Sequence, residues 1–414
     1  MNANIQPLAG IMDGLVIDQP EIASIALDRI AIRVTQRIED VEGDWRRLTA
    51  RGIESPGQSF DFIRLWVRDR AIPESHQRYV VAELDGQVVA LLPLHLKRVF
   101  GVRVLTWFPG ANAGCYAPIV DLERLEALGA EGRTALWRSV ASLLSGAHLL
   151  FLRSIPHPQT DKARLFGELG TALETESLYR AEFTSWEHCD AEQRSRSRRK
   201  HDRQQGDRLA ALGAVTFEEI SDPERARPVI DTMFRQRSER FRKQGIRDCF
   251  VEDKLTGFYQ AAMAASSGLD VRLHVLRLDG EVVAVRYNVV HGERMFCLIS
   301  SMIDSDRIQN GSPGKQCLLR VMQTVFGDGI RTFDMGAGLT DEKRHWCNVQ
   351  IPLRHHYISL SPFGEAVIDV HTSVQRLRRW AKSSPAVKGM LRRVQQWRDR
   401  GQAKGASDQL ETPK

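Results

Sequence analysis

A seven-residue segment that occurs twice constrains the fold of this chain more than any other feature of its sequence. Residues Leu84–Ala90 are LDGQVVA and residues Leu278–Ala284 are LDGEVVA, so six of the seven positions are identical. An Asp-Gly pair between apolar runs is typical of a β-hairpin with a tight turn. After both copies come strand patterns, a helix pattern (131–145; 314–326) and a short apolar strand (148–152; 331–335). The shared order predicts a duplicated α/β unit, with chance recurrence of common hairpin chemistry as the alternative.

The length of 414 residues allows two domains with additional segments. We expect five parts in the chain. These are a flexible leader over 1–29, a first domain over 30–189, a basic linker helix over 190–212, a second domain over 213–365 and a basic helical tail over 366–414.

Two segments account for the net charge of +6. Residues 374–414 hold eleven Lys and Arg against three Asp and Glu, and residues 194–208 hold seven against two, so the remainder is net acidic. An anionic partner would therefore have to bind one of these segments. No aromatic residues interleave the arginines of 194–208, which argues against nucleic acid and favours a solvated linker helix.

The sequence predicts neither a membrane-spanning segment nor a secreted protein. Leu84–Leu96, a long apolar stretch, is interrupted by Asp85, Pro93 and His95, and falls short of the roughly 18 residues that cross a bilayer. The start of the chain lacks the basic and apolar regions of a signal peptide, and the six cysteines form no CxxC pair. We therefore expect free thiols and a cytoplasmic location.

The loop and helix that follow the predicted strand 295–303 form the first candidate site. Pro313 is well placed in a first helical turn, and Gly311, Ser312 and Gly314 let the backbone approach a ligand closely. The backbone N–H groups of that turn, with Lys315 and Arg307 nearby, suit a phosphate or pyrophosphate. An ordinary helix cap by Ser312 is the alternative.

The second candidate site is Asp334, which ends the apolar strand 331–335 just before two glycines. The carboxyl end of a parallel strand is where α/β folds place ligands, although a structural turn cap is the alternative. The nearby residues His345, Cys347, His355 and His356 lack the usual zinc-ligand spacing, so we expect no metal site. Cys347 is expected to be a half-buried thiol and not a nucleophile.

With these features the chain resembles the CelD/BcsL-type cellulose-biosynthesis acetyltransferases. That family lies within the GNAT superfamily and is related in architecture to the tandem-GNAT Fem-type transferases. The likeness covers roughly residues 30–365 and rests on the order of several short motifs: Trp45, Asp85-Gly86, Arg240, Ser312-Pro313-Gly314, Phe333-Asp334, Lys343 and Trp346. It implies an α/β fold of two tandem GNAT-like mixed-sheet units with a C-terminal basic helical extension.

The resemblance also implies roles for individual residues. Helix 313–326, with Arg307, Gly311, Ser312, Gly314 and Lys315, would bind the pyrophosphate of acetyl-CoA or another acyl-CoA, and a backbone N–H of strand 295–303 would face the thioester carbonyl. Asp334 or Glu342 would be the base and Tyr287 a possible acid, without a metal. Arg240, Lys343 and Trp346 would contact the acceptor, and the first copy would shape the acceptor groove.

The activity implied is acetyl transfer to a sugar, a polysaccharide precursor or an amine, in exopolysaccharide or cellulose biosynthesis. Two alternatives remain open at this point. One is a Fem-like aminoacyl or amino-acid transferase. The other is a non-catalytic tandem protein at the periphery of the inner membrane. It would dock through residues 374–400 on a polysaccharide synthase or on an anionic membrane surface.

Overall fold

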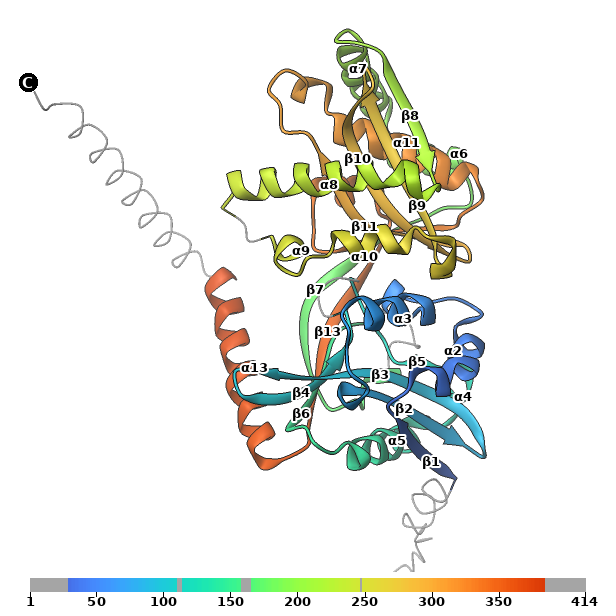
Figure 1. Ribbon diagram of the computed structural model, residues 1–414, viewed down its shortest axis with the longest axis vertical. Coiled ribbons are helices and arrows are strands. Elements are labelled where there is room, and N and C mark those ends of the chain that lie inside the picture. Colours follow the sequence, from blue (N-terminus) through green and yellow to red (C-terminus); the bar gives the residue numbers. More distant parts are fainter. Residues whose placement is uncertain (1–28, 110–113, 158–164, 246–247, 384–414) are drawn as a thin grey trace, which may run out of the picture.

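The computed structural model describes residues 29–109, 114–157, 165–245 and 248–383. Within these residues, one continuous mixed sheet of thirteen strands runs through the molecule. The predicted leader and the part of the tail after residue 383 lie outside the described residues. We call the part from β1 to β7 the first half and the part from β8 to β13 the second half. Apart from β7 and β13, which run through the junction, they are the lower and upper parts of Figure 1.

The first half begins with an antiparallel meander that carries helices between its strands. Its strands are β1 (Ile30–Thr35), β2 (Gln77–Leu84), β3 (Gln87–Val99), β4 (Val102–Trp107), β5 (Ile119–Val120), β6 (Leu149–Pro156) and β7 (Thr171–Glu182). Its helices are α2 (Glu42–Thr49), α3 (Phe60–Asp69), α4 (Leu122–Ala127) and α5 (Gly129–Leu143).

The second half repeats this order after the linker helices α6 (Trp186–Gln193) and α7 (Arg196–Ala210). Its strands are β8 (Val215–Ile220), β9 (Asp270–Leu278), β10 (Glu281–His291), β11 (Arg294–Met302), β12 (Thr332–Ala337) and β13 (Val349–Ser359). Its helices are α8 (Pro223–Lys243), α9 (Cys249–Glu252), α10 (Thr256–Ala262), α11 (Pro313–Gly327) and α12 (Asp341–Trp346), and α13 (Pro362–Ser383) follows β13.

The duplicated hairpin predicted from the sequence is present in both halves. Asp85 and Gly86 join β2 to β3 with φ angles of 53° and 73°, and Asp279 and Gly280 join β9 to β10 with φ angles of 50° and 83°. Two consecutive residues at positive φ define the tight turn that Asp-Gly favours. The two halves therefore share local chemistry as well as element order.

The last strands of the two halves are exchanged. β7, which ends the first half, pairs with β12 of the second, and β13, which ends the second half, pairs with β6 of the first. β7 and β13 also pair with each other, and Figure 1 shows them running together through the junction. Each half thus completes the sheet of the other, and side chains from both meet at the junction.

Each half contains one parallel pair of strands that separates after three residue pairs. In the first half β4 pairs with β6 only from Val104 with Leu149 to Thr106 with Phe151, and in the second half β11 pairs with β12 only from Arg294 with Thr332 to Phe296 with Asp334. Strands that diverge this early leave a wedge between them. The two wedges are filled differently.

Aromatic side chains fill the wedge of the first half. Trp107 and Tyr116 are almost fully buried there, and their rings stack with centroids 6.0 Å apart. Nε1 of Trp107 donates to the carbonyl oxygen of Arg153 in β6 at 3.1 Å, and the backbone N–H of Tyr116 donates to that of Ser154 in the same strand. The corresponding wedge of the second half opens into a cavity. The second half is therefore the one whose wedge has room for a ligand.

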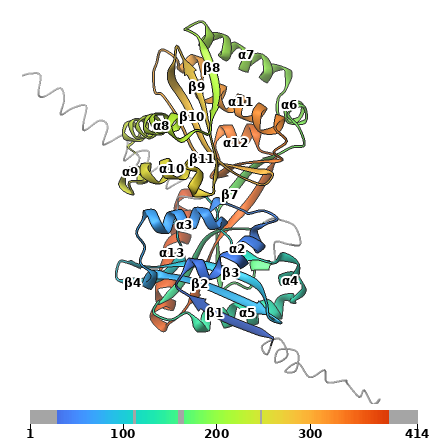
Figure 2. The ribbon, with the colours of Figure 1, turned by 45° about the vertical axis from the view of Figure 1, so that its right-hand side comes forward.

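Two faces of the sheet in the second half are covered by different helices. α8 and α10 pack on one face and belong to a core that continues into the first half, where Phe258 contacts Phe62 and Trp66 at centroid distances of 5.1 Å. α11 packs on the other face, as Figure 2 also shows. No helix in the described part of the chain is long and apolar enough to cross a membrane.

Candidate functional site

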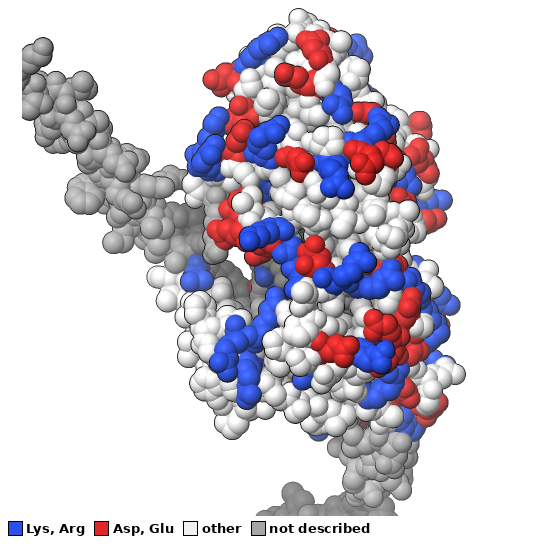
Figure 3. Space-filling view, viewed as in Figure 1, with Lys and Arg blue, Asp and Glu red and all other residues white. Residues whose placement is uncertain are grey.

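A cavity of about 470 Å³ lies where β11 and β12 separate. Its walls include Phe296, Cys297, Leu298 and Ser300 of β11 and the end of β12 with the following turn. The first half contributes the opposite wall: Glu54, Ser55, Pro56, Gly114, Cys115, Arg153, Ser154 and Glu176. Figure 3 shows the surface hollowed between the two halves. The site is thus built from both halves of the duplicated chain.

One edge of β11 faces this cavity without a strand partner. Its ladder with β12 ends at Phe296, while its ladder with β10 continues to Met302. In the described residues, the backbone between Cys297 and Ser301 therefore has ladder partners on the β10 side only. Backbone N–H groups at such an edge can donate to a carbonyl oxygen held in the cavity.

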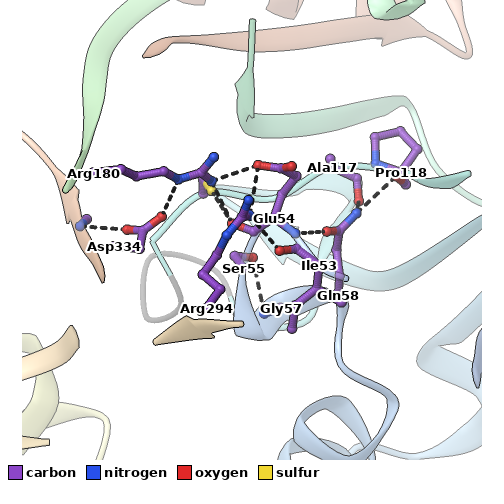
Figure 4. Close-up of polar contacts among 12 residues, drawn as sticks. Ile53, Glu54, Ser55, Gly57, Gln58, Ala117, Pro118, Arg180, Arg294 and Asp334 are labelled. Atoms are coloured by element: carbon purple, nitrogen blue, oxygen red, sulfur yellow. Dashed lines mark hydrogen bonds and ion pairs between the residues drawn. The ribbon is translucent and has the colours of Figure 1, made fainter. Parts of the chain in front are cut away.

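Arg180 of β7 joins the two halves at the floor of the site (Figure 4). Its Nε donates to Oδ2 of Asp334 at 2.8 Å, and its Nη2 donates to Oε2 of Glu54 at 2.7 Å. The side chain of Arg180 is only 3% exposed. Although burial lowers the pKa of this guanidinium, the carboxylates of Asp334 and Glu54 raise it above its usual value. Arg180 is therefore a permanent buried cation between two carboxylates.

Asp334 lies in the cavity wall, as the sequence predicts for a site residue, but both of its oxygens have partners. Oδ2 accepts from Arg180, and Oδ1 accepts from the backbone N–H of Gly336 at 2.8 Å. Both oxygens of this carboxylate are therefore engaged by donors of the protein itself. The structure thus combines the two roles considered for Asp334, because it caps the turn and also lies in the site.

Glu342, at the start of α12, lies in the same cavity wall. Its Oε2 accepts from Nη2 of Arg286 at 2.8 Å, and its side chain is 30% exposed. Among the described residues no donor contacts its Oε1. Of the two carboxylates predicted as the base, Glu342 is the one with an oxygen available to an acceptor molecule.

Arg286 of β10 is a site residue that the sequence analysis does not identify. It lines the cavity, and its buried Nε has no hydrogen-bond partner among the described residues. The thiol of Cys297 lies 3.9 Å from its Nη1. Burial alone would lower the pKa of Arg286, but the carboxylate of Glu342 raises it, so the guanidinium stays charged.

Tyr287, predicted as a possible acid, lies outside the cavity. Successive side chains of a strand point to opposite faces, so that Arg286 faces the cavity and Tyr287 does not. The ring of Tyr287 is fully buried, and its hydroxyl donates to the carbonyl oxygen of Tyr259 at 2.9 Å. Burial raises its pKa well above the usual value. Tyr287 therefore does not reach a substrate in the cavity and is not positioned to act as the acid.

The three predicted acceptor-binding residues lie in different surroundings. Lys343 reaches the cavity wall, but its Nζ donates to the carbonyl oxygens of Gly336, Ala337 and Gly338 and so closes the turn after β12. Trp346 is buried against Trp186 at a centroid distance of 6.3 Å and does not line the cavity.

Arg240, the third of these residues, is exposed on α8 and does not line the cavity, whereas Arg237, one turn earlier, does. Arg237 lies over the rings of Phe241 and Phe250, at 4.2 and 4.3 Å from their centroids. The arginine of α8 that reaches the cavity wall therefore lies one helical turn before the arginine predicted from the sequence.

The start of α11, predicted to bind a pyrophosphate, lies beyond the far end of β11. Ser312 has a φ of 47° and makes no side-chain cap of the helix, so the alternative of an ordinary serine cap is wrong. Its hydroxyl instead accepts from Nε2 of Gln205 in α7 at 2.8 Å. Gly311 is buried against Leu209 of the same helix, where a Cβ would lie 2.8 Å from that side chain.

The other residues of this predicted site face outward or toward β11. Arg307 and Lys315 are exposed. A Cβ on Gly314 would lie 2.9 Å from Sδ of Met302, the last residue of β11. Ser300 of the same strand lines the cavity, so two residues of extended chain, or about 7 Å, separate the cavity wall from the helix start. None of the five predicted residues lines the cavity itself.

The cysteines near the cavity are not activated. Burial raises the pKa of the Cys297 and Cys115 thiols above the usual value, and it raises the pKa of Cys347 to about 12. These thiols are therefore protonated near neutral pH and are poor nucleophiles. The described residues include no group of three or more His, Cys, Asp or Glu side chains that could hold a metal ion.

Glu54 completes the site and was not identified from the sequence. It lies in the segment before α3, and its carboxylate accepts from Arg180 and pairs with Arg294 at 3.4 Å. Burial raises its pKa, but the two arginines more than offset this, so the pKa of Glu54 lies below its usual value. The sequence of this segment indicates a turn at Pro56–Gln58, which Ser55 caps by accepting from the N–H of Gly57. It does not indicate that Glu54 lies in a site.

A known domain family matches the region of the chain that contains most of this site. Residues 196–344 match the acetyltransferase (GNAT) domain family. The match runs from α7 to α12 and includes both separating strands, Asp334 and Glu342. This match, together with the repeated element order of the first half, confirms the predicted fold class, which is a mixed α/β fold with two tandem GNAT-like units.

Solved structures resemble the chain over most of its length. One is the C-terminal domain of a putative lysylphosphatidylglycerol synthetase from Agrobacterium fabrum, at 14% identity and a TM-score of 0.49, which covers 84% of this chain and 96% of its own. FemX has 13% identity and a TM-score of 0.46, with coverage of 67% and 87%.

A tandem GNAT protein from the clavulanic acid biosynthesis pathway has 12% identity and a TM-score of 0.43, with coverage of 80% and 99%. No curated protein matches the chain by sequence. At these identities the likeness to solved structures concerns the fold alone. It does not indicate that this chain uses the donors or the acceptors of those proteins. None of these comparisons bears on cellulose biosynthesis.

Proposed function

We propose that this chain is an acyltransferase that uses acetyl-CoA or another acyl-CoA and acts on an amine or a sugar hydroxyl. The observation that carries the proposal is the separation of β11 from β12, which leaves an unpaired strand edge and a carboxylate-lined cavity in the GNAT-matched region. The matching wedge of the first half is filled by aromatic rings, so the donor is assigned to the second half alone.

The residues present fit an acyl-CoA at this place. The start of α11 offers backbone N–H groups and the exposed side chain of Lys315, which suit a pyrophosphate. The unpaired edge of β11 leads from there to the cavity and can accompany an extended chain. Acyl-CoA supplies an acyl thioester, whose carbonyl oxygen would accept from an N–H of β11.

Glu342 is the residue that we propose as the general base. An ammonium or hydroxyl group must lose a proton before or during attack on the thioester. Glu342 lines the cavity, and no protein donor among the described residues contacts its Oε1. Arg286 holds the other oxygen and so fixes the direction of the carboxylate. A thiol has an ordinary pKa of about 8.5, so the thiolate of CoA can leave without much help from an acid. The proposed mechanism therefore needs no other acid in place of Tyr287.

The acceptor is proposed to enter from the side of the first half. Glu54, Arg153 and Ser154 line that wall and offer hydrogen-bond donors and acceptors. Such groups suit a polar acceptor, and a sugar or polysaccharide precursor is the form implied by the resemblance to the CelD/BcsL-type enzymes. A role in exopolysaccharide or cellulose biosynthesis is part of this proposal and rests on that resemblance.

Titration calorimetry with CoA and desulfo-CoA tests the donor site. Gly314→Val should weaken CoA binding by roughly tenfold or more, because the added side chain meets Met302 at the helix start. Gly327→Val, at the other end of α11, is the matched control, since a Cβ there meets no atom within 4 Å. Equal affinity in both variants would place the donor elsewhere.

A thermal-shift panel separates the classes of donor. Stabilisation by acetyl-CoA and by desulfo-CoA supports the proposal. Stabilisation by aminoacyl-tRNA with no response to either CoA compound would instead favour a Fem-like aminoacyltransferase. No response to any donor would favour a non-catalytic tandem protein.

A further inference from the structure

The turn between β3 and β4 presents a phenylalanine to solvent in an unfavourable backbone conformation. Phe100 is fully exposed, at 102% of the reference value, and has a φ of 47°, while Gly101 follows with a φ of 85°. Bulky residues rarely adopt positive φ, and Asn or Gly is preferred at this position of a tight turn. Folding alone therefore does not account for a phenylalanine at the tip.

Two arginines flank this tip on opposite strands. Arg98 of β3 and Arg103 of β4 are direct partners in the antiparallel register, and both are exposed. Like charges directly opposite each other are unfavourable in a sheet. Among the described residues neither has an acidic partner, so this cation pair can receive an external anion. The next pair toward the tip is Val99 with Val102, and Val99 is 46% exposed.

The helix α13 carries a second exposed apolar surface. Its inner side packs through Ile368 and Thr372, which are buried. The side chains on its opposite side are exposed: Phe363 at 54%, Val370 at 66%, Val374 at 40% and Leu377 at 62%. The spacings of seven, four and three residues place these four on one face of the helix. Arg378, which is exposed, lies beside this face.

The hairpin and α13 lie on the same side of the first half. Val102 and Val104 of β4 share one apolar cluster with Val367 and Ile368 of α13. The backbone N–H of Arg103 donates to Nδ1 of His148, whose ring lies 5.0 Å from that of Phe363. Figure 1 shows both elements at the left of the lower half, where Figure 3 shows Lys and Arg side chains gathered without Asp or Glu among them.

We propose that this surface binds an anionic phospholipid bilayer. The docking face consists of Arg98, Val99, Phe100 and Arg103 of the hairpin and Phe363, Val370, Val374 and Leu377 of α13. A projecting aromatic side chain inserts between lipid headgroups, the paired arginines bind lipid phosphates, and an apolar helix face bordered by Arg378 lies along the interface. The basic composition of residues 374–414 adds attraction to the same negative surface.

The charge pattern favours a bilayer over a protein partner. Two opposed arginines and a single projecting phenylalanine suit a fluid surface that supplies phosphate and hydrocarbon within a short depth. The inference is independent of the proposed acyl transfer, because no residue of the docking face lines the cavity. It concerns where the enzyme works and not what it catalyses.

Co-sedimentation of the full chain with vesicles tests the proposal. The chain should bind vesicles of phosphatidylglycerol and phosphatidylcholine, and binding should be weak to phosphatidylcholine alone and should fall as salt rises. Phe100→Asn should reduce binding about tenfold or more without lowering Tm, because asparagine is favoured at this backbone angle. The double variant Arg98→Ser/Arg103→Ser should reduce binding to the anionic vesicles by a similar factor.

Two matched controls distinguish the docking face from general surface effects. Leu143→Asn replaces a 51% exposed leucine elsewhere on the first half, and Arg196→Ser/Arg203→Ser removes two exposed charges from α7. Both controls should bind as the parent chain does. Equal losses in the controls, or full binding by Phe100→Asn, would overturn the proposal. So would a parent chain that sediments no more with anionic than with neutral vesicles.

Discussion

The Nε of Arg180 lies 2.8 Å from Oδ2 of Asp334, and this buried ion pair joins the last strand of the first half to β12 of the second. The two side chains are 3% and 6% exposed. Because β7 and β13 are exchanged between the halves, an arginine of the first copy holds the central carboxylate of the second. The candidate site therefore depends on the duplication itself.

Arg180→Met should destabilise the fold by about 3–5 kcal/mol, since it leaves the carboxylate of Asp334 buried without its cation. Arg294→Met is the control, because Arg294 is 24% exposed and its pair with Glu54 is longer, at 3.4 Å. Urea unfolding of both variants measures the difference. A loss below about 1 kcal/mol for Arg180→Met would show that the pair does not hold the halves together.

Glu342→Gln should lower turnover by roughly 10²–10⁴ with CoA affinity near that of the parent chain, because the amide keeps the shape and cannot accept a proton. Asp334→Asn should act mainly through stability and the acceptor KM, since both oxygens of Asp334 are engaged by Arg180 and Gly336. Steady-state kinetics with a varied acceptor separates the two effects. The reverse pattern would make Asp334 the base.

Local sequence chemistry predicts the elements of this fold well. The Asp-Gly pairs predict both hairpins because only a few residue types tolerate two consecutive positive φ angles. The helix pattern 314–326 corresponds to α11, and the short apolar strand 331–335 corresponds to β12 (Thr332–Ala337). In each case the signal lies within a few neighbouring residues.

The site is harder to predict because it depends on side-chain direction and on distant pairing. A shift of one residue on β10 separates Arg286, which lines the cavity, from Tyr287, which does not. One turn of α8 separates Arg237 from Arg240 in the same way. Arg180 lies on the exchanged strand β7 and Glu54 lies in a segment of the first half, so their meeting with Asp334 depends on long-range pairing that no local pattern in the sequence encodes.

Thermal stability should fall as the pH drops from about 6.5 toward 4. Burial lowers the pKa of His356 to about 4, and burial also lowers that of His355 to about 4. The folded state thus favours the neutral imidazoles, whereas the unfolded chain binds protons near pH 6.5. The stability that the two neutral histidines contribute is therefore complete above about pH 6.5 and is lost as the pH falls toward 4.

His356→Gln should flatten part of this decline, because it removes a ring whose nitrogens contact His157 and the carbonyl of Leu169, each at 2.8 Å. His188→Gln, at an exposed position on α6, is the control. Tm measured between pH 4 and 7.5 follows both variants. The same slope in the parent chain and His356→Gln would assign the acid sensitivity to other groups.

Removal of residues 374–414 should leave a cooperatively folded chain with an acidic isoelectric point. The buried contacts of α13 through Ile368 and Thr372 precede the cut, and Val374 and Leu377 beyond it are exposed. A cut after Ser361 removes the whole helix and should be costly, because it uncovers Val104 and Leu149. Circular dichroism during urea unfolding compares the two truncations, and equal stability would contradict the packing described.

Hydrogen–deuterium exchange with and without acetyl-CoA tests most directly whether the second half alone holds the donor. The account predicts slower exchange in peptides that contain Cys297–Ser301 of β11 and the first turn of α11. Exchange in β4 and β6 should stay unchanged, because aromatic rings fill the wedge between those strands. Protection of β4 and β6, or no protection of β11, would contradict the central claim.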